Sequence, residues 1–188
     1  MYLNIFIRED GKTATVWFNG PSVRQFLDMP RQPLEIGCNF IEQHRNVDHV
    51  CAYDRPVIEK LTKAGLKEHV QYWTRKHFKT ERFREVPIDQ FGFKHGAGFD
   101  SGTLALSVAF VLGCEKITLL GFDWHITNDS LYDQDYTWRN GKRPIKFTLA
   151  KKNFIEELGE KIHIEIVHDD VRDKYKNVSW IPTKDFTP

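Results

Sequence analysis

The chain has 188 residues, of which 40% are apolar and 28% are charged, and its formal net charge is +1. This length and composition are typical of one globular domain with a sizeable core, and the near-neutral charge argues against a nucleic-acid or membrane-surface binder. Three cysteines outside any CxxC pair predict reduced, buried thiols and a cytoplasmic location. We expect no membrane span and no signal peptide, because charged residues interrupt every apolar run before roughly 18 residues.

The first half of the chain alternates strand and helix patterns. Short apolar, β-branched or aromatic runs predict strands over Thr13–Phe18, Leu34–Gly37, His49–Tyr53 and Val70–Thr74. Ser22 is expected to cap a short helix that ends near Leu27, and Asp54 to cap a helix over Pro56–Ala64. Residues 75–100 have no clear period, so they are predicted to be loop with one short strand near Val86.

The second half holds the most regular patterns. Thr103–Leu112 is apolar on nearly every side, which predicts a buried helix, and Lys116–Leu120 is typical of a parallel strand buried on both faces. Residues 124–147 are rich in polar and aromatic residues without a period, and we interpret them as an ordered, irregular lid insertion. An amphipathic helix is then predicted over Thr148–Leu158 and a last strand over Ile162–Val167. The helix residues expected to face inward are Leu149, Phe154, Ile155 and Leu158.

The order of these elements predicts the fold. Strands that alternate with helices favour an α/β, Rossmann-like architecture with a mainly parallel sheet and helices on both faces. We expect residues 1–188 to form a single nucleotide-binding domain, with the lid as an insertion and a tail after Asp173 that is mostly loop. Ligands of such folds bind at the carboxyl ends of the strands, so polar residues just after strands are the first candidates for a site.

Two small-residue turns precede predicted helices and are candidates for close contact with a ligand. Gly20 follows the first strand, with Asn19 and Ser22 as side-chain donors beside it, and the next helix would direct its N–H groups at an anion. Ser101 and Gly102 begin the buried helix and are candidates for the same reason. Each turn also has a purely structural interpretation, as a strand-to-helix turn with a Ser or Thr cap.

Ionisable residues near other strand ends are candidates for chemistry. Asp123 closes the central strand, where it would orient a hydroxyl, bind a cation, act as a base or cap a helix or turn, and His125 lies two residues beyond it. His125 and His168 are lone histidines, a class that is more often structural than catalytic. Asp54 fits an N-cap better than a ligand contact, and the basic cluster 75–84 is interpreted as a solvated face. The histidines have no metal-ligand spacing, so no metal is expected.

Taken in order, four of these segments resemble the bacterial sialyltransferases of glycosyltransferase family 42. They are Asn19–Ser22, Cys38–Asn39, Ser101–Gly102 with its helix, and Leu120–Asp123. The resemblance spans about residues 13–165, and its specificity lies in order and spacing, because each motif is short. It implies a Rossmann-like domain that binds a cytidine-monophosphate-linked sugar without a metal or another cofactor. The nucleotide-binding candidates are then Asn19, Gly20, Ser22, Asn39, Ser101, Gly102 and Gly121.

One departure and a second resemblance leave several functions open. The family places a catalytic histidine at the end of its lid, where this chain has Arg143–Thr148 and no histidine, so Asp123 and His125 are the catalytic candidates. Three segments also resemble 6-hydroxymethylpterin pyrophosphokinase-like proteins, which transfer diphosphate from a nucleoside triphosphate with magnesium: Gly20–Ser22, Val47–Val50 leading to Asp54, and Ser101–Asp123. The hypotheses are a sialyltransferase-like glycosyltransferase, a pyrophosphokinase-like phosphotransferase and a nucleotide-binding module without catalysis. The acceptor and the oligomeric state, a homo-oligomer included, stay open.

Overall fold

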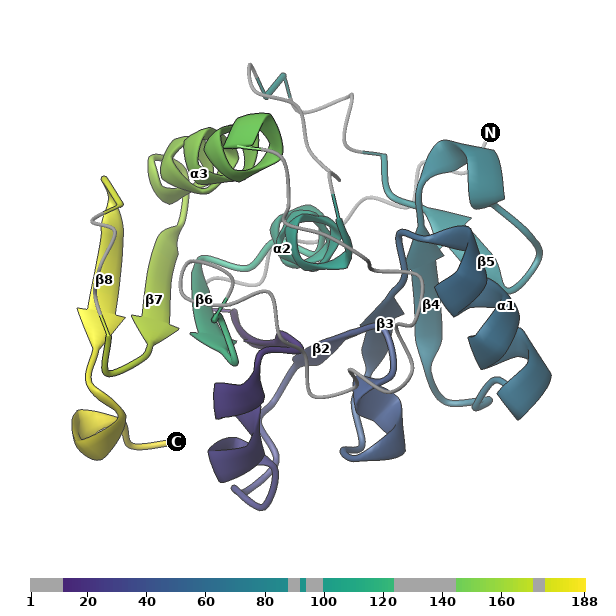
Figure 1. Cartoon of the computed structure of the whole chain (residues 1–188), viewed down its shortest axis with the longest axis horizontal. Coiled ribbons are helices and arrows are strands. Elements are labelled where there is room, and N and C mark those ends of the chain that lie inside the picture. Colours follow the sequence, from purple (N-terminus) through teal and green to yellow (C-terminus); the bar gives the residue numbers. More distant parts are fainter. Residues whose placement is uncertain (1–11, 88–91, 94–99, 124–144, 171–174) are drawn as a thin grey trace.

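The computed structural model describes residues 12–87, 92–93, 100–123, 145–170 and 175–188. Within these residues, eight strands form one sheet in the order β5-β4-β3-β2-β1-β6-β7-β8 (Figure 1), and every neighbouring pair is parallel. The strands are β1 (Thr13–Trp17), β2 (Glu35–Cys38), β3 (His49–Cys51), β4 (Gln71–Thr74), β5 (Phe83–Glu85), β6 (Lys116–Leu120), β7 (His163–Val167) and β8 (Val178–Ile181). The expected parallel sheet is confirmed.

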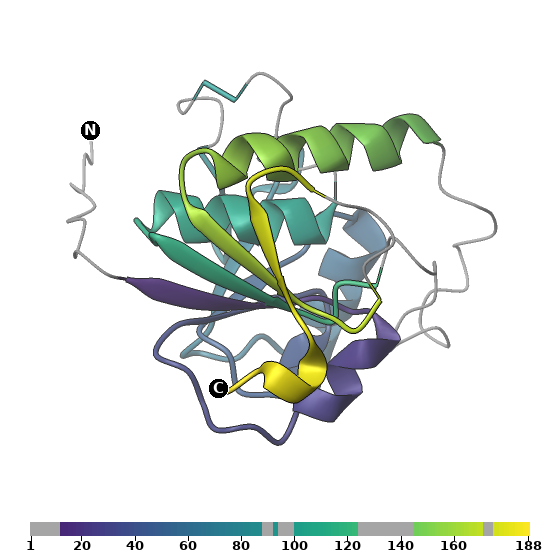
Figure 2. The same ribbon diagram turned by 90° about the vertical axis from the view of Figure 1, so that its left-hand side faces the viewer.

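Helices cover both faces of this sheet, as expected. The longer helices are α1 (Arg55–Ala64), α2 (Ser101–Val111) and α3 (Ile145–Gly159), and the 3-10 helix η1 spans Pro21–Phe26. Figure 2 shows α2 and α3 on one side of the strands and η1 on the other. The fold is therefore α/β and Rossmann-like.

Successive residues of the strands supply the cores of the two faces. In β1, Val16 belongs to the core cluster beneath α2 and α3, whereas Trp17 belongs to the cluster that contains Val57 of α1. In α2, ten of eleven residues are buried, which explains why its sequence is apolar on almost every side. The central strands β1 and β6 are thus fixed from both faces, and the segments that follow them begin from rigid positions.

The tail of the chain differs from the sequence-based prediction. It was expected to be mostly loop, but it contains β8, which pairs with β7 in parallel. The expectation that Ile162–Val167 is the last strand is therefore wrong. None of the four β8 residues is fully buried, because β8 forms an edge of the sheet. A short edge strand lacks the continuous apolar run by which buried parallel strands are recognised.

The helix before β7 also differs from its prediction. It begins at Ile145 rather than Thr148, so residues 145–147 of the expected lid are helical, and the other lid residues, 124–144, lie outside the described residues. Phe154, Ile155 and Leu158 are buried as expected, but Leu149 is 57% exposed. Leu149 lies five residues before Phe154, which places it about 140° around an α-helix from that side chain.

The expected cap of η1 is wrong, whereas the expected state of the cysteines is confirmed. Ser22 does not cap η1: the N-cap position is Gly20, and η1 has no side-chain cap. The three cysteines are buried free thiols, as predicted. In the part of the chain that the structure describes, no helix has the length and apolarity to cross a membrane.

Candidate functional site

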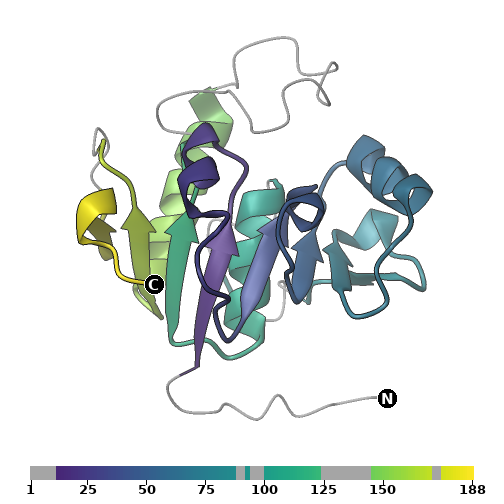
Figure 3. The same cartoon turned by 90° about the horizontal axis from the view of Figure 1, so that it is seen from below.

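The order of the strands reverses once, between β1 and β6. From β1 the chain continues outward through β2 to β5 on one side, and β6 to β8 lie on the other side. Open α/β sheets bind ligands beyond the carboxyl ends of their strands at such a reversal. Because the register pairs Trp17 with Leu120, the segments that follow β1 and β6 lie beside each other there. Figure 3 shows η1, in purple, at the end to which the arrowheads of the strands point.

Two glycines let these segments approach closely. The N–H of Gly20 donates to the carbonyl of Gly121 at 3.0 Å, and a Cβ on Gly20 would overlap the Asp123 carboxylate. Gly121 has φ of 71°, a conformation that favours glycine, and a Cβ there would lie 2.6 Å from Val23. Both predicted ligand-binding glycines are therefore required by the packing of the two loops.

Asp123 connects three segments at this point. Its Oδ2 accepts the backbone N–H of Ser22 at 2.7 Å, and its Oδ1 lies 2.8 Å from Nε2 of His168, directly after β7. Nδ1 of His168 lies 2.9 Å from the backbone nitrogen of Asp170 and 3.2 Å from its carbonyl oxygen, so it can accept in the neutral ring and donate in the charged ring, while Nε2 donates to Asp123. The Asp123 side chain is buried, and that of His168 is nearly so.

These contacts set the charge states of the pair. Burial raises the pKa of Asp123, but the hydrogen bonds from His168 and Ser22 outweigh it and hold this pKa below its ordinary value. The hydrogen bond to Asp123 raises the pKa of His168 above its ordinary value, against the effect of burial. A low-pKa carboxylate whose two oxygens both accept hydrogen bonds is suited to orienting its neighbours and poorly suited to taking a proton from a substrate.

A second polar cluster lies at the ends of β2 and β3. Ser101 Oγ donates to Asn39 Oδ1 at 2.5 Å and accepts the N–H of Tyr53 at 3.0 Å. Asn39 has φ of 53°, which is uncommon for a residue with a side chain and recurs at functional sites. The bond from Ser101 uses the Asn39 oxygen, so the amide nitrogen and its two hydrogens point to a different side. The predicted residues Asn39 and Ser101 are thus brought together.

The N-terminus of α2 is capped by the chain itself. Asp100 accepts the N–H of Thr103 at 2.9 Å, and the two residues form a capping box. The buried Lys151 of α3 forms an ion pair with the same carboxylate. A Cβ on Gly102 would overlap the ring of Phe18, so this glycine has a packing role. The structural interpretation of the turn before α2 therefore holds, with Asp100 as the cap rather than Ser101 or Thr103.

The predicted site residues form two groups. Gly20, Ser22, Gly121 and Asp123 meet at the ends of β1 and β6, while Asn39 and Ser101 meet at the ends of β2 and β3. Asn19 also follows β1, and His125 lies outside the described residues. Sequence reasoning considered His168 but did not place it in the site. The available signal was that His168 and Asp123 follow predicted strands whose ends meet at one edge.

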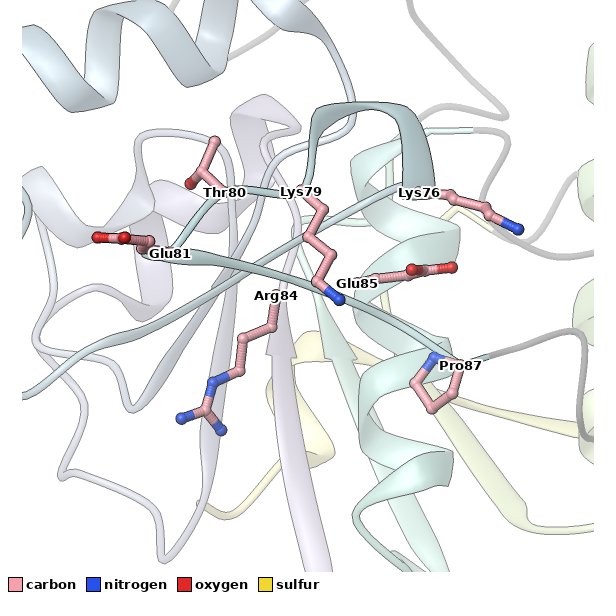
Figure 4. A pocket seen from close by; sticks show the side chains of 7 residues that line it. All are labelled: Lys76, Lys79, Thr80, Glu81, Arg84, Glu85 and Pro87. Atoms are coloured by element: carbon pink, nitrogen blue, oxygen red, sulfur yellow. The ribbon is translucent and has the colours of Figure 1, made fainter. Parts of the chain in front are cut away.

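A groove of about 660 Å³ lies at the β5 edge of the sheet, away from β1 and β6 (Figure 4). Its lining side chains are Lys76, Lys79, Thr80, Glu81, Arg84, Glu85 and Pro87. These residues come from β5 and from the segment between β4 and β5, so the groove is separate from the reversal of strand order. Its lining combines basic and acidic side chains.

The fold is similar to that of solved bacterial sialyltransferases. A variant of the sialyltransferase CstII in complex with CMP has 14% identity and a TM-score of 0.54, over 82% of this chain and 80% of that protein. The monofunctional α-2,3-sialyltransferase Cst-I from Campylobacter jejuni has 13% identity and a TM-score of 0.53, over 88% of this chain and 79% of that protein. Comparisons with protein families and with curated protein sequences gave no match. At these identities the likeness establishes the fold.

Proposed function

We propose that this protein binds a nucleotide or a nucleotide-sugar where β1 and β6 end. The observation that carries the proposal is the close approach of the Gly20 and Gly121 loops at the reversal of strand order, held by Asp123. The two glycines let the loops after β1 and β6 meet without side chains between them, and this position is the binding crevice of open α/β sheets. Solved proteins of similar fold include a sialyltransferase in complex with CMP, which supports a cytidine nucleotide as the ligand.

We further propose that the activity is glycosyl transfer of the sialyltransferase-like kind. The donor would extend from the β1–β6 crevice toward Asn39 and Ser101, whose fixed geometry supplies a directed amide donor. Transfer to a hydroxyl requires a group that accepts its proton. Asp123 holds the loop and His168 in place, so we assign it a positioning role and keep His125 as the proposed base.

The pyrophosphokinase-like alternative fits this geometry less well. That function would give importance to both Asp54 and Asp123 as metal or substrate contacts. Asp54 follows β3 and Asp123 follows β6, three strand spacings apart in the sheet. At ~4.8 Å a spacing, the two strand ends lie ~14 Å apart, which is too far for both carboxylates to bind one metal ion. Magnesium-dependent consumption of ATP by the purified protein would favour this alternative nonetheless.

A ligand panel tests the binding proposal. Thermal melts are measured with CMP, UMP, AMP and GMP, and a ligand at 100 times its Kd should add ~2.7 kcal/mol of stability. We expect CMP to give the largest shift, and a CMP-linked sugar to release CMP when a suitable acceptor is present. If all four nucleotides leave the melting temperature unchanged at millimolar concentration, the binding proposal is wrong. CMP binding without turnover would support the non-catalytic module.

Two serines of α2 provide a matched pair of variants. Ser101 Oγ bonds to Asn39, whereas Ser107 Oγ donates to the Thr103 carbonyl within the helix at 2.7 Å, and both serines are buried. Ser101→Ala should weaken binding of the CMP-linked sugar about 5-fold, the equivalent of one hydrogen bond. Ser107→Ala should leave that affinity unchanged. Equal effects of the two substitutions on affinity would count against a ligand role for Ser101.

A further inference from the structure

Arg75 occupies an unusual environment at the carboxyl end of β4. Its guanidinium lies over two aromatic rings, with Cζ 4.5 Å from the ring centroid of Tyr53 and 4.3 Å from that of Phe78. Tyr53 also contacts the site through its N–H, which donates to Ser101 Oγ. Two rings this close limit the positions that the guanidinium can take and the directions from which a partner can reach its N–H groups.

The hydrogen bonds of Arg75 differ sharply from those of Arg45, another arginine that lies over an aromatic ring. Arg45 lies over Trp17 and donates to Glu35 and to the carbonyls of Leu27, Met29 and Pro30. Nε of Arg75 is buried and has no hydrogen-bond partner, and no acidic side chain among the described residues forms an ion pair with it. Arg75 as a whole is only half-buried, and an unmade hydrogen bond at its buried Nε is costly, so an acceptor that reached this nitrogen would be bound favourably.

We propose that Arg75 is an anion-binding residue that holds a carboxylate or phosphate group of the substrate. A planar guanidinium binds such groups through two parallel hydrogen bonds, and Nε of Arg75 is unpaired among the described residues. β4 lies three strand spacings from β1, so Arg75 is ~14 Å along the sheet from the Gly20 loop. The anion is therefore a group outside the nucleotide, on the transferred sugar or on the acceptor. Its assignment to the substrate rests on the proposed function, whereas the anion site rests on Arg75 alone.

The neighbouring groove is a weaker candidate for the same anion. It begins at Lys76 and contains Lys79 and Arg84, but Glu81 and Glu85 line it as well (Figure 4). The mixed charges give it little net preference for an anion, and its basic side chains are exposed and flexible. Lys79 lies on the same edge of the sheet, and its replacement removes the same charge, so it provides a matched control for Arg75.

Inorganic phosphate and acetate are suitable probes, titrated at constant ionic strength and followed by the melting temperature. We expect phosphate to stabilise the wild-type protein and Arg75→Gln to bind it at least about 10-fold more weakly. Arg75→Lys should retain part of the effect, and Lys79→Met should retain all of it. If neither anion stabilises the wild-type protein, or if Arg75→Gln keeps the full phosphate shift, the proposal is wrong.

A second measurement needs no variant and therefore does not depend on whether Arg75→Gln folds. Phenylglyoxal modifies arginine side chains, and peptide mass spectrometry locates the modified residues. We expect phosphate to slow the modification of Arg75 and to leave that of the exposed Arg55 unchanged. Equal rates at Arg75 with and without phosphate would contradict the proposal.

The affinity of Arg75→Gln for CMP decides which part of the substrate supplies the anion. An unchanged CMP affinity in Arg75→Gln assigns the anion to the sugar or the acceptor, as proposed. A lower CMP affinity in this variant would assign it to the nucleotide phosphate and overturn the placement beyond the nucleotide. If CMP does not bind the wild-type protein at all, the proposed function fails, while the phosphate and phenylglyoxal results still decide the anion site.

Discussion

The pair formed by Asp123 and His168 offers the sharpest test of how the candidate site is held together. Asp123→Asn keeps the shape of the side chain but removes its charge, and the amide offers only one oxygen to Ser22 and His168. The Asp123 side chain is 5% exposed and that of His168 is 11% exposed, so solvent replaces little of what is lost. A hydrogen bond to a charged group contributes ~1.5–3 kcal/mol, and we expect the variant to lose ~2–3 kcal/mol of unfolding free energy. For a chain of this length, the melting temperature should fall by roughly 4–12 °C.

The pH dependence of this effect has a definite sign. The pKa of His168 is raised, so its contribution is fully present below the ordinary histidine value of about 6.5 and is lost as pH rises through the folded-state pKa. The pKa of Asp123 is lowered, so its contribution is present above the ordinary aspartate value of about 3.9 and is lost as pH falls through the folded-state pKa. The attraction between the two charges should therefore be strongest between about pH 4 and pH 6.5.

A double-mutant cycle measures this attraction. Urea unfolding of the wild-type protein, Asp123→Asn, His168→Gln and the double variant is compared at about pH 5.5 and about pH 9. The coupling energy should be larger at the lower pH, because the neutral imidazole at high pH keeps the hydrogen bond and loses the charge. A coupling energy that is zero, or one that is the same at both values of pH, would refute the ion-pair description.

Three substitutions test other parts of the structure, each by chemical denaturation. Gly20→Ala should destabilise by ~1–3 kcal/mol, because its Cβ would overlap the Asp123 carboxylate; wild-type stability would show that the loops can separate freely. Arg45→Met should cost ~3–5 kcal/mol, because it leaves the fully buried Glu35 carboxylate without its guanidinium, and a loss below 1 kcal/mol would contradict a desolvated pair. Leu149→Gln should change stability by less than about 0.5 kcal/mol, since Leu149 is exposed, and a larger loss would place Leu149 in a contact of the folded state.

The central part of the fold could be predicted from the sequence because most of its residues are buried. Most residues of β6 and all but one of α2 are buried, so their apolar character is easily recognised. β8 could not be found in this way, because an edge strand that is half exposed lacks a continuous apolar run. Leu149 shows that an apolar residue need not be buried. It lies in the amphipathic helix α3 and was predicted to face inward, although its angle around the helix does not match that of the buried residues.

The site could be predicted only in part, because sequence patterns identify strand ends but not the contacts between them. The residues after β1 and β6 were predicted as candidates because the end of each strand can be recognised from its own sequence. The bond from Asp123 to His168 depends on β7 lying next to β6, and Arg75 becomes notable only through the rings of Tyr53 and Phe78. From composition alone, Arg75 belonged to a basic cluster that was interpreted as a solvated face. Its buried Nε contradicts that interpretation for this residue.

The order of the strands gives the two proposed binding regions a common geometry. Gly20 and Asp123 lie at the ends of β1 and β6, Asn39 at the end of β2 and Arg75 at the end of β4, all on one edge of the sheet. Asn39 is thus one strand spacing from the nucleotide crevice and two spacings, ~10 Å, from the Arg75 anion site. A substrate that reaches both regions must pass Asn39 and Ser101. Under the proposed function, the hydrogen-bonded pair of Asn39 and Ser101 would therefore lie beside the middle of such a substrate, where a side chain held in one position can orient it.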